Sequence, residues 1–131
     1  MIANERIKQV RLHRKLSSGE LATNAGVSSA EISLIESKMR RPKTDTLQRI
    51  AAALEVTTSY LLGEVNENLT LEAALAKESL QIFLRLTNPA YPERQWLIDI
   101  AEKSSAPESV KGWRDLVANV SIYHQFLRQH S

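Results

Sequence analysis

Apolar residues recur at helical spacing along most of the chain. Ile7 and Val10 lie one turn apart and predict a helix over residues 4–15, to which Leu12 and Leu16 add apolar contacts. Comparable apolar groups continue to Gly63 and predict four more short helices. The polar stretch 64–70 follows, and then three further helical patterns lie around residues 71–86, 96–101 and 113–127. The pattern therefore predicts an all-α protein with a five-helix domain over residues 1–64 and a three-helix domain over residues 65–131.

Two predicted helix starts share the same local sequence pattern. The sequence Ser-Ser-x-Glu occurs at residues 17–20 and again at residues 28–31. A serine before a helix accepts a hydrogen bond from a free backbone N–H, and a glutamate three residues later can return the bond, which makes a capping box. Each copy is therefore predicted to open a helix with a complete capping box.

The turn between these two helices contains a glycine. Gly26 stands where the chain leaves the first helix, a position that favours the positive φ that glycine adopts at little cost. Small and branched apolar residues on both sides supply the contact between the helices: Leu21, Ala22, Ala25, Val27, Ile32 and Ile35. Together these features predict a helix-turn-helix.

Charge is divided unequally between the two predicted domains. Residues 1–63 hold ten lysines and arginines against six carboxylates, whereas residues 64–131 hold seven against nine. Arg11 and Arg14 are expected to give the first helix a basic outer face, and four cations follow the second capping sequence. A basic helical module of this kind is typical of nucleic-acid binding, although solvated helix faces can have the same composition.

Residues 5–63 resemble the Cro/CI-like (XRE) family of transcriptional repressors. The resemblance lies in an ordered set of segments, "LATNAGVS", "ISLIES", the Pro42 after the basic turn, "TLQRIAAALEV" and "TTSYLLGE". It implies a five-helix, lambda-repressor-like DNA-binding domain in which the helix over residues 29–37 enters the major groove. The chain departs from the family at Ser18, where glutamine is usual, and at Lys38, where glycine is usual. Either Lys38 has a strained backbone conformation, or the loop follows another path.

The predicted groove-facing residues are short and weakly polar. Because Ile32 and Ile35 point inward, helical geometry and the resemblance leave the following residues to read bases: Ser28, Ser29, Ala30, Ser33 and Leu34. None of them makes a bidentate contact with guanine or adenine, so we expect modest direct readout. Two residues keep alternative interpretations, since Leu34 can belong to the edge of the core and Glu31 can either cap the helix or contact a base.

The predicted phosphate contacts flank this helix. The loop cations correspond to the backbone clamp of the family, and the two serines stand at a helix N-terminus, whose N–H groups attract anions: Lys38, Arg40, Arg41, Lys43, Ser17 and Ser18. Such residues position a protein on DNA without reading its sequence. A solvated loop with incidental charge is the alternative.

The last helical pattern carries an apolar stripe near heptad spacing, which we interpret as a dimer interface with a share in the internal core: Trp113, Leu116, Val117, Val120, Tyr123, His124 and Leu127. A domain of this size often needs oligomerisation for stability. The segment "QWLIDIAEKSSAPESVKGWRDLVANVSIYHQFL" is also loosely similar to repressors that a metallopeptidase inactivates by cleavage.

The composition argues against other classes of protein. With no cysteine and three distant histidines, neither a disulfide nor a metal site is expected, and no cofactor is predicted. No apolar run approaches membrane-spanning length and no signal-peptide core is present, which indicates a cytoplasmic protein without a membrane partner. No catalytic set or phosphate-binding glycine loop is present, so an enzyme is not expected.

Two functions remain. The first is a repressor that binds double-stranded DNA at a palindromic operator as a homodimer. The second is an antitoxin or protein-interaction module whose C-terminal part binds another protein, with DNA binding used for autoregulation. The regulatory protein or metallopeptidase would then be the partner of residues 65–131.

Overall fold

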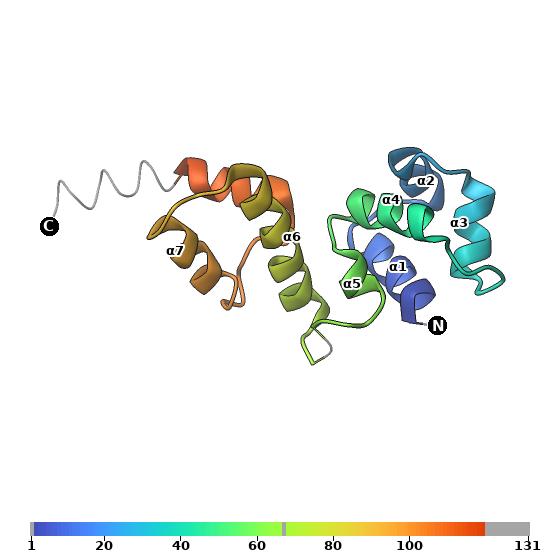
Figure 1. Ribbon diagram of the computed structural model, residues 1–131, viewed down its shortest axis with the longest axis horizontal. Helices are drawn as coiled ribbons and strands as arrows, with labels where there is room; N and C mark the ends of the chain where they lie inside the picture. The colour runs from blue at the N-terminus through green and yellow to red at the C-terminus, as the bar shows by residue number, and fades with distance from the viewer. Residues whose placement is uncertain (1, 67, 120–131) are drawn as a thin grey trace, which may run out of the picture. The chain divides into compact units, whose positions relative to one another are not determined.

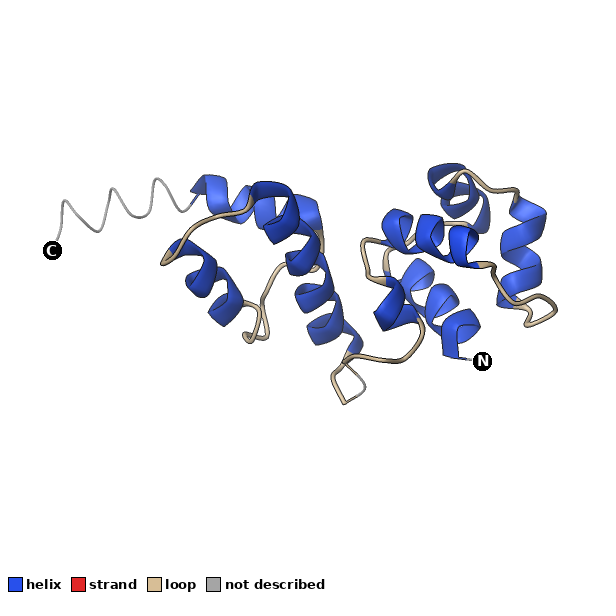
Figure 2. Cartoon of the chain, viewed as in Figure 1, coloured by secondary structure: helices blue, strands red, loops and turns tan. Residues whose placement is uncertain are grey.

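The computed structural model describes residues 2–66 and 68–119, and every regular element within them is a helix (Figures 1 and 2). The chain divides into two compact units, Met1–Leu71 and Glu72–Ser131. The all-α fold class is therefore confirmed. Among the described helices, none is long and apolar enough to cross a membrane.

The N-terminal unit contains the five predicted helices. They are α1 Ile2–His13, α2 Ser18–Ala25, α3 Ser29–Glu36, α4 Thr44–Leu54 and α5 Thr58–Leu61. The first helix begins and ends two residues earlier than predicted. In Figure 1, α1 to α5 surround one core, whose most deeply buried apolar residues come from all five helices: Ile7, Val10, Leu21, Ile32, Ile35, Ile50, Leu54 and Leu61.

The two serine caps differ. At α2 the capping box is complete, because Ser17 Oγ accepts from the Glu20 N–H at 3.0 Å and Glu20 Oε1 accepts from the Ser17 N–H at 3.0 Å. The hydrogen bond from the Ser17 backbone lowers the pKa of Glu20. At α3 only half of the predicted box is present. Ser28 Oγ accepts from the Glu31 N–H at 3.1 Å, but the Glu31 carboxylate is held elsewhere, by Arg40.

Two left-handed residues shape the loops on either side of α3. Gly26 caps α2 with φ 70° and ψ 34°, as predicted for the turn. Lys38 has φ 65°, which is a strained, left-handed backbone conformation. Of the two alternatives for this position, the strained backbone is the one observed. The basic loop consequently leaves α3 directly after Ser37, which caps its C-terminus.

Buried polar groups tie α1 to α3, a feature that the predicted basic outer face of α1 did not include. Asn4 is fully buried and its Nδ2 donates to the carbonyl oxygens of Ile35, at 2.6 Å, and Arg40, at 3.0 Å. Arg11 forms a bidentate pair with Glu36, at 2.7 and 2.9 Å. The prediction of an exposed basic face was therefore wrong for Arg11. Leu12, which was expected to add apolar contacts, is 56% exposed.

The C-terminal unit is built from α6 (Leu71–Thr87), α7 (Glu93–Ile100) and a third helical stretch over residues 110–119. Its core contains eight buried residues from these segments: Ala76, Leu80, Phe83, Leu84, Leu97, Ala101, Val110 and Trp113. The Trp113 indole is fully buried, and its Nε1 donates to Ser79 Oγ at 3.0 Å. Pro92 lies at the N-cap of α7.

Replacing Gly19 in α2 by alanine should stabilise the protein. A methyl group at this position would meet only Ser17 Oγ and Ser29 Oγ, both at 3.9 Å, which is ordinary contact distance. We expect a gain of about 1 kcal/mol in the free energy of unfolding, because alanine loses less backbone entropy in a helix. Urea denaturation measures the effect.

The matched control is Gly26→Ala, at φ 70°, where a Cβ is strained and a loss of about 1 kcal/mol is expected. Equal effects of the two alanines would contradict the assignment of different backbone roles to these glycines.

Candidate DNA-binding surface

The exposed side of α3 is formed by the residues predicted to read bases. Ser28, Ser29, Ala30 and Ser33 are exposed, whereas Ile32 and Ile35 are fully buried against the rest of the unit. Leu34 is half-buried, in keeping with a position at the edge of the core. The helix therefore presents small polar side chains at its N-terminal half, the part of a recognition helix that meets base edges.

The N-terminus of α2 lies beside that of α3. A Cβ at Gly19 would lie at the same distance from Ser17 Oγ and Ser29 Oγ, so the first turns of both helices open on one face. Ser17 is exposed and Ser18 is half-buried there. This arrangement brings the two predicted phosphate-binding serines next to the predicted base-reading surface, with the N–H groups of a helix start between them.

All four loop cations are exposed, and Lys38 and Arg40 pair with carboxylates. Lys38 Nζ donates to Glu5 Oε1 at 2.8 Å, and this hydrogen bond lowers the pKa of Glu5. Arg40 Nη1 donates to Glu31. Arg41 and Lys43 continue the basic loop towards α4, for which Lys43 is the N-cap residue.

Glu31 contributes to this surface as a partner of Arg40, an interaction that neither of its sequence-based interpretations anticipated. Sequence reasoning also missed Met39, which is 77% exposed between the cations of the loop. A signal was available in the sequence for Met39, since one long apolar side chain interrupts a run of four cations. No comparable local signal marks Glu5 as the partner of Lys38, because 33 residues separate them.

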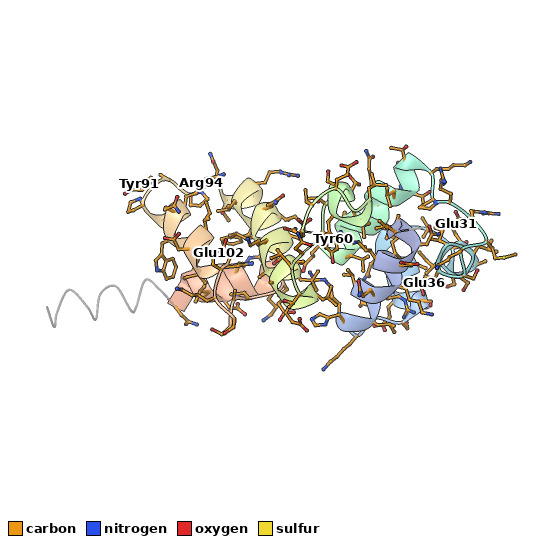
Figure 3. All side chains as sticks on the ribbon, turned by 90° about the horizontal axis from the view of Figure 1, so that it is seen from below. Glu31, Glu36, Tyr60, Tyr91, Arg94 and Glu102 are labelled. Carbon is orange, nitrogen blue, oxygen red and sulfur yellow. The ribbon has the colours of Figure 1, made fainter. Side chains whose placement is uncertain are left out.

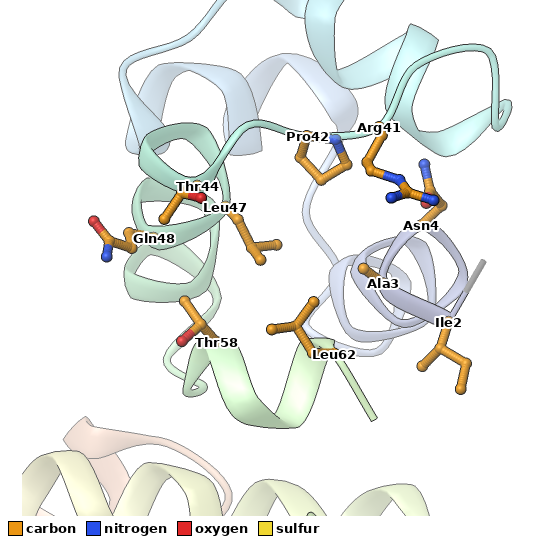
Figure 4. A pocket seen from close by; sticks show the side chains of 10 residues that line it. All are labelled: Ile2, Ala3, Asn4, Arg41, Pro42, Thr44, Leu47, Gln48, Thr58 and Leu62. Atoms are coloured by element: carbon orange, nitrogen blue, oxygen red, sulfur yellow. The ribbon is translucent and has the colours of Figure 1, made fainter. Parts of the chain in front are cut away.

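A hollow of about 470 Å³ lies behind the basic loop (Figure 4). Its wall combines apolar side chains from α1, α4 and α5 with Arg41 and Pro42 of the loop: Ile2, Ala3, Leu47 and Leu62. The polar lining residues besides Arg41 are Asn4, Thr44, Gln48 and Thr58. Within the described part of the chain, no cluster of histidine, aspartate and glutamate has the grouping that a metal ion requires.

The predicted dimer interface is described only in part. Trp113 is fully buried in the core of the C-terminal unit, in keeping with the share in the internal core that was predicted for the stripe. Leu116 and Val117 are half-buried and pack against the same core. Val120, Tyr123, His124 and Leu127 lie outside the described residues.

The geometry of the N-terminal unit defines its class. Residues 7–61 match the model of a helix-turn-helix family. With two capped helices joined through a left-handed glycine and a basic loop after the second helix, this unit is a helix-turn-helix domain of the Cro/CI-like (XRE) type.

Several curated proteins are similar to this part of the chain. The immunity repressor of Bacillus phage phi105 is 36% identical over 64 residues, which are 49% of this chain and 44% of that protein. The regulator SinR of Bacillus subtilis is 38% identical over 64 residues, 48% and 58% of the two chains. The repressor RghR of Bacillus subtilis is 43% identical over 59 residues, 44% of each chain. The matches thus span about half the length of these relatives.

A solved structure of a complex between SinR and SinI is also similar. It matches with a TM-score of 0.48 and 26% identity, covering 88% of this chain and 98% of the other.

Proposed function

We propose that the protein is a sequence-specific DNA-binding transcriptional regulator that acts as a repressor. One observation carries the proposal: the exposed N-terminal half of α3 lies beside the N-terminus of α2, and Arg40 of the basic loop after α3 reaches back to Glu31 in its first turn. The helix-turn-helix match and the similarity to repressors support it. The base-reading set is Ser28, Ser29, Ala30, Ser33 and Leu34, and the phosphate set is Ser17, Ser18, Lys38, Arg40, Arg41 and Lys43.

The chemistry of this surface sets what the regulator can recognise. Serine hydroxyls donate to or accept from several bases, and Ala30 can pack against a thymine methyl group. Phosphate contacts from the loop then supply most of the affinity, and the base-facing residues supply a modest discrimination.

Replacing Arg41 and Lys43 together by glutamine should weaken binding to all duplexes. Both side chains are exposed in the loop, so the change removes charge without opening the core. The slope of log affinity against log salt concentration should become shallower by roughly 0.9 for each lost phosphate contact. Fluorescence anisotropy with a random-sequence duplex between 50 and 200 mM salt, concentrations that span the sensitive range, measures this slope.

The control variant replaces Lys103 and Arg114, two exposed cations of the C-terminal unit, by glutamine. It changes the net charge by the same amount and should leave the slope nearly unchanged. Equal slopes for the two double variants would mean that the basic loop has no special role in binding.

We further propose that residues 1–64 act as the DNA-binding domain and residues 65–131 as a domain that pairs two copies on a near-palindromic operator. One helix-turn-helix domain makes few contacts, and two linked half-sites multiply affinity. Half-sites about 34 Å apart, or a multiple of that distance, are then expected. Binding sites selected from random DNA would show this symmetry.

Exposed apolar residues of the C-terminal unit favour a second candidate, in which this unit binds another protein. Leu86 is 68% exposed, Tyr91 81% and Ile98 39%. Contiguous exposed apolar patches mark sites of protein contact. The partner would then be an antagonist protein or a metallopeptidase, with DNA binding used for autoregulation. Sedimentation of the purified protein distinguishes a homodimer from a monomer that needs another chain.

A further inference from the structure

Glu20 and Glu31 occupy the same position, three residues after a serine cap, yet their carboxylates do different things. The Glu20 carboxylate accepts a hydrogen bond from the Ser17 N–H and completes its capping box. The Glu31 carboxylate pairs with Arg40 and not with the Ser28 N–H. Figure 3 marks Glu31 on the part of the N-terminal unit that carries α3. The Glu31 side chain is 21% exposed and that of Arg40 53% exposed. The pair therefore lies at the border of the proposed DNA-binding surface, open to solvent on the arginine side.

The backbone of Arg40 is held in place independently of this pair. Its N–H donates to the Leu34 carbonyl oxygen at 3.2 Å, and its own carbonyl accepts from the buried Asn4 at 3.0 Å. Because the start of the side chain is anchored, the guanidinium can reach only a limited volume. Glu31 draws it back towards the first turn of α3, away from positions further out along the loop.

Keeping the Arg40 guanidinium away from DNA phosphates affects specific and non-specific binding differently. On random DNA, phosphate contacts supply essentially all the affinity, and any cation within reach of a phosphate adds to it. On a preferred sequence, base contacts seat α3 in one position, and there the anchored Arg40 reaches a phosphate without leaving Glu31. Releasing Arg40 should therefore raise the affinity for random DNA more than the affinity for a preferred site.

We propose that Glu31 is a specificity-determining residue that acts by sequestering Arg40 from the phosphates of random DNA. The inference rests on the proposed DNA binding. An acidic residue of the recognition helix then lowers the affinity for DNA of any sequence. Lower affinity for random DNA reduces the competition from the many non-specific sites of a genome.

The test compares the wild type with Glu31→Gln, which keeps the shape of the side chain and removes its charge. The probes are a random-sequence duplex and a duplex recovered from a random pool by the wild-type protein. We expect the affinity for the random duplex to rise about fivefold, the upper range for an exposed ion pair. The salt slope on that duplex should steepen by roughly 0.9, one added phosphate contact. On the selected duplex the rise should be less than about twofold, so the specificity ratio falls.

A double-mutant cycle separates sequestration from direct repulsion between Glu31 and DNA. With Arg40 replaced by glutamine as well, Glu31→Gln should have no further effect on the random duplex, because the cation to be released is absent. The same increase in that background, an equal increase on both duplexes, or no increase at all overturns the proposal. Glu64→Gln, an exposed carboxylate outside this surface, controls for net charge.

Two further readouts keep the outcomes distinct. Circular dichroism and thermal unfolding verify that each variant is folded, and Glu31→Ser supplies a second charge-removing variant should the glutamine destabilise the helix. A wild-type protein that binds neither duplex would contradict the proposed function itself, whereas a wild type that binds both but does not respond to Glu31→Gln contradicts only the role of Glu31.

Discussion

Truncation after Leu71 should leave a folded protein that binds a full palindromic operator ~100-fold more weakly than the intact chain does. The expectation follows from linkage, because two joined recognition units bind the second half-site as an intramolecular event, which raises affinity by roughly 10²- to 10⁴-fold. Removing the joining unit turns two linked events into independent ones. Binding to a single half-site should change little, since the truncated unit keeps the whole proposed DNA-binding surface.

The N-terminal unit carries its own core, so the truncated protein is expected to remain folded. Its fully buried side chains, among them Leu21, Ile32 and Leu61, come from residues before Leu71. Arg6 also donates to the carbonyl oxygens of Tyr60 and Val65, which fastens the end of the unit to α1. Circular dichroism verifies the helical content before binding is compared.

Electrophoretic mobility shifts with whole and half operators, together with sedimentation equilibrium, measure the effect of truncation. A truncated protein that still dimerises and binds the whole operator as tightly as the intact chain would assign the C-terminal unit to another partner. That outcome would favour the second proposed function, in which the unit binds a different protein.

Local features of the fold were predictable because neighbouring residues determine them. The Ser17 capping box and the left-handed Gly26 depend on contacts within a few residues, so both can be recognised in the sequence. The spacing of Ile32 and Ile35 was enough to identify the buried side of α3, and hence its exposed side. The same logic held for the three helical segments of the C-terminal unit.

Long-range polar contacts were not predictable in the same way. The partner of Glu31 is nine residues away and that of Lys38 is 33 residues away, so no periodicity links them. The second capping sequence has the same Ser-Ser-x-Glu pattern as the first. At the second, Arg40 competes with the backbone N–H of Ser28 for the glutamate carboxylate, and within the described residues the first has no such cation beside it. The guanidinium of Arg40 carries a positive charge and the Ser28 N–H does not, so the pair with Arg40 adds a Coulomb attraction for the carboxylate.

The buried stripe of the C-terminal unit shows a second limit. Trp113 belongs to an apolar stripe with heptad-like spacing, a pattern that suits an internal core and an interface between subunits equally. Its indole N–H needs a partner when buried, and Ser79 of α6 supplies it within the same unit. That hydroxyl lies 34 residues away in the sequence, so the stripe alone could not show that Trp113 belongs to the core.

Breaking the pair between Arg11 and Glu36 should cause the largest loss of stability among single substitutions in α1. The side chains are only 10% and 9% exposed, and the guanidinium donates to both carboxylate oxygens and to the Leu16 carbonyl at 2.8 Å. The hydrogen bond from Arg11 to Glu36 raises the pKa of Arg11. Replacing Arg11 by methionine leaves a nearly buried carboxylate without its partner, and we expect a loss of about 3 kcal/mol in the free energy of unfolding.

The double variant Arg11→Met with Glu36→Leu tests whether this loss comes from the stranded charge. Two apolar side chains of similar volume leave no charge to be buried alone, so the double variant should recover most of the stability that the single variant loses. Urea denaturation of the wild type, the two single variants Arg11→Met and Glu36→Leu, and the double variant gives the coupling energy of the pair. A double variant as unstable as Arg11→Met would show instead that the geometry of the bonds between α1 and α3, and not the charge left behind, is what holds the recognition helix against the first helix.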